Sequence, residues 1–227
     1  MTLDITPLRG RQLLIGVTAA LVIVGAISYV WRARSTSSVR SDLRPFEAIG
    51  EVAAQEVAKV LGGKGQIVLL VVDTTSDRNR ERTQNAEVKS FLNIIKRQPG
   101  LTVSATERIA FSESDPRMGG SPLTSAVLFQ LLDKFSSADA IVLLAGWPML
   151  SADDIAKLRD RKLPKLVAFS TIGDAAKPLV AERIVQAIIT PRAGAAASSR
   201  QKTNSVRELF DQSFTLITPE TLAASGG

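Results

Sequence analysis

Short apolar runs alternate along this chain with longer segments in which apolar residues recur every three or four positions. The first run, Gln66–Asp73, is apolar between its two ends and rich in β-branched residues. Such a run is typical of a strand that is buried on both faces of a parallel sheet. Further strands are predicted at 101–106, 140–146, 165–170, 184–190 and 214–218.

The segments between these strands carry the 3.6-residue periodicity of amphipathic helices. Helices are predicted at 45–60, 80–97, 121–135, after Ser151, at 174–182 and near 206–210. Alternating strands and helices joined by right-handed crossovers form a three-layer α/β sandwich. We therefore predict a mostly parallel five-stranded sheet in the order 2-1-3-4-5 within an α/β domain over 45–192. A flexible loop at 193–204 and a helix/strand tail at 205–227, frayed at its end, follow this domain.

An uncharged segment at 12–31 precedes the domain. Twenty helical residues span about 30 Å, the hydrocarbon thickness of a bilayer. Tyr29 and Trp31 stand at its end, where aromatic rings favour the headgroup level. We predict a single transmembrane helix between a polar head (1–11) and a linker (32–44), with the lipid bilayer as its partner. A cleaved signal peptide is the alternative, but no small-residue cleavage motif follows the run.

The orientation of this anchor rests on two opposing signals. More Arg residues follow the run than precede it, which favours a cytoplasmic domain. A short basic head placed directly before an apolar run is instead typical of an uncleaved signal-anchor, which exports the domain attached to its carboxyl end. We predict an extracytoplasmic, periplasmic domain at the cell membrane.

Composition excludes several functions. The net charge is +6, but residues 1–44 hold six Arg and two Asp and thus most of the excess, so a nucleic-acid-binding groove is not expected. The chain has no Cys and no His. Zinc sites with thiolate or imidazole ligands, thiol nucleophiles and Ser-His-Asp triads are therefore excluded. We expect no metal site and no cofactor.

The carboxyl ends of the predicted strands carry the candidate ligand-binding residues, because ligands of open parallel sheets bind at that edge. They are Asp73, Thr74 and Thr75 after the first strand, Gly146 and Trp147 after the third, and Ser170 and Thr171 after the fourth. In this hypothesis Trp147 stacks on a ring or sugar, and Asp73 accepts hydrogen bonds. In the alternative, the acidic and hydroxyl residues cap the next helix, and Trp147 covers the edge of the core.

Other motifs do not carry chemistry. The run Gly62–Gly65 lacks the phosphate-loop spacing and precedes a strand, and neither G-x-G-x-x-G after the first strand nor G-x-S-x-G is present. A receiver domain would need an acceptor Asp where the third strand ends in Gly146 and Trp147. Asp153 and Asp154 fit the first turn of a helix better than a metal site.

The stretches Gln66–Thr75 and Ser137–Gly146, the second with the pattern x-D-A-I-V, resemble one lobe of the type I periplasmic-binding-protein fold. The resemblance covers about 65–192 and is greatest to single-lobe, membrane-anchored bacterial relatives whose function is unassigned. Transport receptors of this family have two lobes that close on a ligand, whereas this chain has residues for one. The resemblance therefore implies the fold without implying capture by lobe closure.

Two hypotheses of function are consistent with these patterns. In the first, the chain is a non-enzymatic accessory or scaffolding subunit of a membrane protein complex, and exposed apolar residues at 46–60 or 206–217 contact its partners. In the second, it is a small-ligand sensor or receptor that uses the crevice at the strand ends. A hydrolase remains a third alternative, because Asp, Ser and Lys can act without His.

Overall fold

The computed structural model describes residues 42–74, 77–110, 123–192 and 205–225. Among these residues, no helix has both the length and the apolar character needed to cross a membrane. The predicted span at 12–31, Thr75 and the loop at 193–204 lie outside the described residues.

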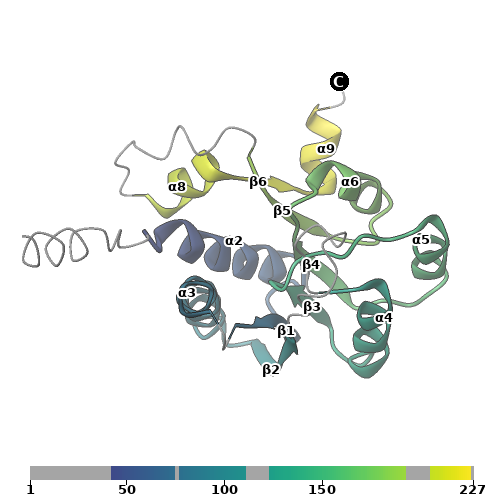
Figure 1. Cartoon of the computed structure of the whole chain (residues 1–227), viewed down its shortest axis with the longest axis horizontal. Coiled ribbons are helices and arrows are strands. Elements are labelled where there is room, and N and C mark those ends of the chain that lie inside the picture. Colours follow the sequence, from purple (N-terminus) through teal and green to yellow (C-terminus); the bar gives the residue numbers. More distant parts are fainter. Residues whose placement is uncertain (1–41, 75–76, 111–122, 193–204, 226–227) are drawn as a thin grey trace, which may run out of the picture. The chain divides into compact units, whose positions relative to one another are not determined.

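The core of the domain is one six-stranded sheet in the order β2-β1-β3-β4-β5-β6 (Figure 1). Its strands are β1 (Gly65–Asp73), β2 (Leu101–Ala110), β3 (Ala140–Leu143), β4 (Lys165–Phe169), β5 (Ala187–Pro191) and β6 (Phe214–Ile217). The first five pair in parallel, which confirms the predicted order. The expectation of five strands was wrong, because β6 pairs antiparallel with β5 and extends the sheet. Its Phe214 contacts the apolar cluster on one face of the sheet, and its Ile217 contacts the cluster on the other.

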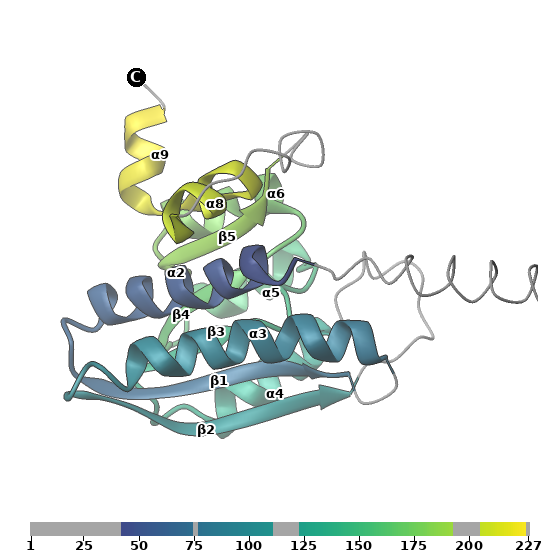
Figure 2. The same ribbon diagram turned by 90° about the vertical axis from the view of Figure 1, so that its left-hand side faces the viewer.

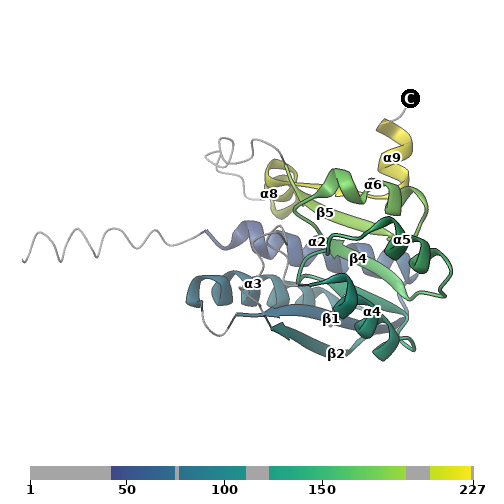
Figure 3. The same ribbon diagram turned by 45° about the vertical axis from the view of Figure 1, so that its right-hand side comes forward.

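Helices cover both faces of the sheet and complete the predicted three layers (Figures 1 and 3). One face carries α2 (Arg44–Val60), α3 (Arg78–Ile95) and α8 (Val206–Ser213). The other carries α4 (Ser125–Lys134), α5 (Ala152–Arg159) and α6 (Gly173–Ala181), followed by α9 (Pro219–Ser225), whose Leu222 packs on the same cluster. The end of the chain was predicted to be frayed, yet α9 continues as a helix to Ser225.

The apolar run of β1 divides between the two clusters as its alternation requires. Ile67, Leu69 and Val71 contact the α2/α3 layer, whereas Val68 and Leu70 contact the α4/α5/α6 layer. All five side chains are at most 3% exposed. The prediction that this strand is buried on both faces is thereby confirmed.

Helices α2 and α3 lie side by side over the sheet (Figure 2). Gly50 of α2 stands against the backbone of α3, where a Cβ atom would lie 2.0 Å from the carbonyl oxygen of Glu87. Only glycine allows this approach.

Local capping explains where several helices begin. Asp77 caps α3 by accepting from the Asn79 and Arg80 amides, and Ser151 forms a capping box with Asp154 at α5, as predicted for a helix starting there. Helix α4 begins later than expected. Its cap is Thr124, which accepts from the Val127 amide, and not Ser121.

Candidate functional site

The ends of β1, β3 and β4 meet along one edge of the sheet, as the parallel order requires. Strand β1 extends beyond its neighbour, because its last partner in β3 is Leu143, opposite Leu70, while β1 continues to Asp73. The chain leaves β3 where the amides of Leu144 and Ala145 both donate to the Leu70 carbonyl, at 2.9 and 3.0 Å. Strand β3 therefore ends earlier than the sequence predicts.

This early exit turns Trp147 into the protein. Gly146 adopts a φ of +98°, a backbone conformation that residues other than glycine rarely adopt. Trp147 follows it, with only 4% of its surface exposed. Its side chain belongs to the cluster beneath α4, α5 and α6. The ring is thus a part of the core and does not offer the open stacking face that the ligand hypothesis requires.

The hydroxyl residues of the predicted site separate into internal and open positions. Thr74 is 7% exposed, and its hydroxyl donates to Gln84 Oε1 at 3.0 Å, which ties the end of β1 to α3. Ser170 is fully buried and accepts from the Ile172 amide at 3.2 Å. Asp73 is half-buried at the end of β1, and Thr171 lines an open cleft.

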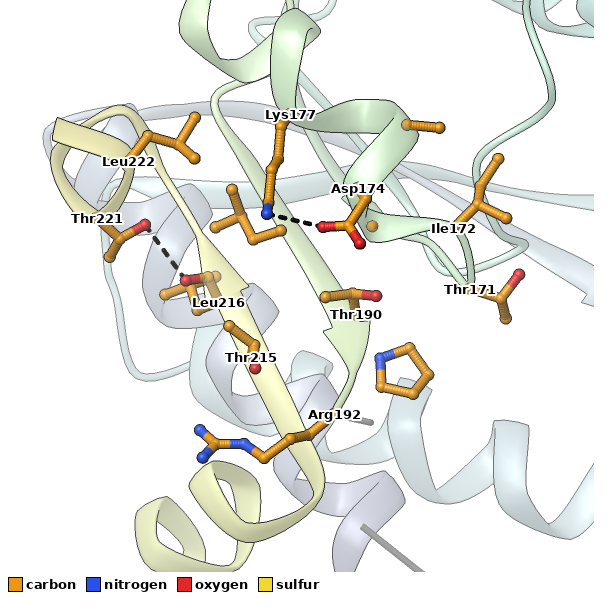
Figure 4. A pocket seen from close by; sticks show the side chains of 14 residues that line it. Thr171, Ile172, Asp174, Lys177, Thr190, Arg192, Thr215, Leu216, Thr221 and Leu222 are labelled. Atoms are coloured by element: carbon orange, nitrogen blue, oxygen red, sulfur yellow. Dashed lines mark hydrogen bonds and ion pairs between the residues drawn. The ribbon is translucent and has the colours of Figure 1, made fainter. Parts of the chain in front are cut away.

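That cleft, here called the α6–tail groove, has a volume of about 750 Å³. Helix α6 forms one wall, the ends of β5 and β6 form the floor, and Thr221 and Leu222 of α9 form the other wall (Figure 4). Its polar lining side chains are Thr171, Asp174, Lys177, Thr190, Arg192, Thr215 and Thr221. The tail therefore supplies part of the lining, whereas the site predicted from the sequence included no residue of the tail.

The floor of the groove presents two adjacent hydroxyls. Thr190 of β5 and Thr215 of β6 are directly paired in the antiparallel ladder, so their side chains stand on the same face of the sheet. Gly173, at the start of α6, lies so close to Thr190 that an added Cβ would come within 2.6–2.8 Å of its side-chain atoms. This contact brings the first turn of α6 against the floor. The sequence signal for this polar floor is Thr190, a hydroxyl residue that follows the apolar Ile189 near the end of a predicted strand.

Charges in the groove are partly compensated. The Asp174 carboxylate and the Lys177 amine form an ion pair at 2.7 Å (Figure 4). The pKa of Asp174 lies below its ordinary value. The main cause is the hydrogen bond that Lys177 donates to the carboxylate, and the positive charge of Lys177 is the second cause. Among the described residues, no acidic side chain forms an ion pair with Arg192, the third charged residue of the lining.

Most apolar side chains of the two segments expected to dock partners, 46–60 and 206–217, are buried or half-buried, and Val206 is exposed. Ile49, Val52 and Val57 of α2 are at most 1% exposed, and Phe210 of α8 is fully buried, because these two helices pack against each other over the sheet. The large hydrophobic side chains that stand exposed in the described part of the chain are Met149 and Val206. These segments therefore offer little exposed apolar surface, and binding of partners through them stays a prediction.

The chain was compared with protein-family models, with curated proteins and with solved structures. No protein-family model matches the sequence, and no curated protein matches it. Among solved structures, a sugar-binding protein of a sugar ABC transporter from Bacillus halodurans aligns with a TM-score of 0.51 and 18% identity, over 79% of this chain and 63% of that one. An ABC transporter periplasmic solute-binding protein from Actinobacillus succinogenes, with bound D-allose, aligns with a TM-score of 0.51 and 12% identity, over 78% of this chain and 59% of that one.

These structures share the fold with this chain at low sequence identity. The chain spans about three fifths of the length of each of them. The resemblance to the periplasmic-binding-protein fold, expected from the first and third strands, is confirmed as a likeness of fold.

Proposed function

We propose that this domain binds a small hydroxylated molecule of the sugar class in the α6–tail groove, without catalysing a reaction. The observation that carries the proposal is the groove itself, in which polar side chains from two helices and two strands converge on one open volume. Its size lies within the range of about 300–1,000 Å³ that is usual for small-molecule sites.

The lining suits the two kinds of surface that a sugar presents. Thr190 and Thr215 offer hydroxyls that both donate and accept hydrogen bonds. Ile172, Pro191 and Leu222 supply apolar surface against which the C–H face of a sugar ring can pack. The solved structures of the same fold include a sugar-binding protein and a protein with bound D-allose, which favours the same ligand class here.

The membrane part of the proposal rests on the sequence. We propose that residues 12–31 anchor the domain at the cell membrane with its groove on the extracytoplasmic side. An accessory role in a membrane complex remains the second hypothesis. We rank it below ligand binding, because most of the apolar side chains through which it would act are buried.

Thermal denaturation with a panel of neutral hexoses and pentoses tests the proposal. A sugar at 100 times its Kd stabilises the folded protein by about 2.7 kcal/mol. In a chain of this size, that free energy should raise the Tm by about 5–10 °C. Calorimetric titration of the sugars that pass this screen then gives the affinities.

The variant Thr215→Val keeps the shape of the side chain and removes the hydroxyl. It should weaken binding by about tenfold, since a polar ligand group loses its partner. The matched control is Thr102→Val on β2, at the opposite edge of the sheet, where the side chain is exposed. A panel without any stabilising sugar, or equal affinities for the wild type and Thr215→Val, would contradict the proposed site.

A further inference from the structure

We propose that the sugar held in the α6–tail groove carries an anionic group, a carboxylate or a phosphate, that binds the guanidinium of Arg192. This inference rests on the proposed function and specifies its ligand. Three observations carry it, namely the charge balance of the groove, the placement of Arg192 and the position of the hydroxyl pair beside it.

The charge balance leaves one positive charge without an internal partner. Among the fourteen lining residues the charged ones are Asp174, Lys177 and Arg192. Asp174 and Lys177 form an ion pair at 2.7 Å, so their charges compensate each other. In the described part of the chain Arg192 has no ion-pair partner, so the lining has a net charge of +1.

The backbone fixes Arg192 at the open end of the floor. Its amide donates to the Ser213 carbonyl at 2.9 Å, and the preceding residue, Pro191, pairs with Phe214. Figure 4 shows the side chain leaving the end of β5 on the side of β6, with Thr215 beside it. A planar guanidinium binds carboxylate and phosphate oxygens in pairs, and these charge-assisted hydrogen bonds are stronger than those that the hydroxyls of a neutral sugar accept.

The hydroxyl pair stands next to this cation along the two strands. Thr190, on β5, lies two residues before Arg192, which directly follows the strand, and Thr215 is the direct partner of Thr190 on β6. One ligand can therefore bind Arg192 through its anionic group while its hydroxyls contact Thr190 and Thr215. This combination of groups is that of a uronic acid or a sugar phosphate.

Calorimetric titration with matched ligands tests the inference on the full chain. Glucose, galactose and mannose are each compared with their uronate and their 6-phosphate, so that every pair differs only in the charged group. We expect one anionic form to bind at least about tenfold tighter than its neutral parent, as a charge-assisted hydrogen bond predicts. We also expect added NaCl to weaken the binding of the anionic form alone. A preference for the uronate or for the phosphate identifies the source of the charge.

The variant Arg192→Gln should abolish the preference for the anion, so that the anionic form binds no more tightly than its neutral parent in this variant. Arg97→Gln, an exposed substitution beyond α3, is the control and should alter neither affinity. Neutral sugars that bind as tightly as their anionic forms, or an anion preference that survives in Arg192→Gln, would overturn the inference and leave the proposed function standing. If neither neutral nor anionic sugars bind, the proposed function falls as well.

Discussion

Replacing Gly50 by alanine tests the packing of the two helices that cover one face of the sheet. The added Cβ would lie 2.0 Å from the carbonyl oxygen of Glu87, 2.9 Å from its carbonyl carbon and 3.0 Å from the amide nitrogen of Phe91. All three atoms belong to the backbone of α3, so no side-chain rotation relieves the clash. Because non-bonded heavy atoms are most stable at about 3.5–4.0 Å, α2 and α3 would have to separate by about 1 Å or more.

The sign of the effect distinguishes packing from helix propensity. Alanine is favoured over glycine inside a helix by about 1 kcal/mol, so propensity alone predicts a more stable protein. Overpacking costs about 1–3 kcal/mol, and here it also disturbs the contacts of Phe91, which is fully buried. Because the clash is with backbone atoms, we take the upper part of this range and subtract the propensity gain, so Gly50→Ala should lower the free energy of unfolding by about 1–2 kcal/mol.

Urea unfolding followed by circular dichroism measures this change. Gln55→Ala, at an exposed position of the same helix, is the control and should stay within about 0.5 kcal/mol of the wild type. A Gly50→Ala protein that is as stable as the wild type, or more stable, would show that the two helices do not touch at this point.

Two further predictions concern a buried acid and the anchor. Burial raises the pKa of Glu87 to about 8 from 4.5, so between these pH values the folded protein holds a proton that the unfolded chain has lost, and stability falls as the pH rises through this window. Glu87→Gln should flatten this decline in urea midpoints measured from pH 5 to pH 8.5, and a decline of the same steepness in the variant would refute the assignment. The double substitution Leu21→Arg and Val24→Arg should release the chain from membranes, because each charge costs about 2.5–3.5 kcal/mol at the centre of a span. Retention in the membrane pellet after a carbonate wash would contradict the predicted anchor.

Much of the fold could be predicted because its buried strands are visible in the sequence as short apolar runs. The run from Ile67 to Val71 contacts both helix layers, and only a strand within a covered parallel sheet needs five consecutive apolar residues of this kind. The direction of β6 could not be predicted in the same way. Its residues Phe214–Ile217 indicate a strand, but the antiparallel pairing depends on how α8 folds back over α2.

The candidate site was harder to predict, because a residue that follows a strand can turn either way. Trp147 and Thr171 both follow buried strands, yet Trp147 turns into the core after the early exit of β3, and Thr171 faces the groove. This difference depends on two amides that share the Leu70 carbonyl, a detail without a sequence signature. The polar residues at the strand ends thus predicted the correct edge of the sheet. Which of them have exposed side chains depends on the local path of the backbone, which the sequence does not reveal.

The position of the tail gives the proposed ligand site two walls. Small-molecule sites usually enclose most of their ligand, which a bare sheet edge does not. Here Thr221 and Leu222 of α9 lie opposite α6, so the same chain supplies both walls. The same segment also completes the core through Phe210, which is fully buried against α2. Removing residues 205–227 would therefore destroy the fold and the groove together. Point substitutions such as Thr215→Val and Arg192→Gln are consequently the changes that can separate ligand binding from stability.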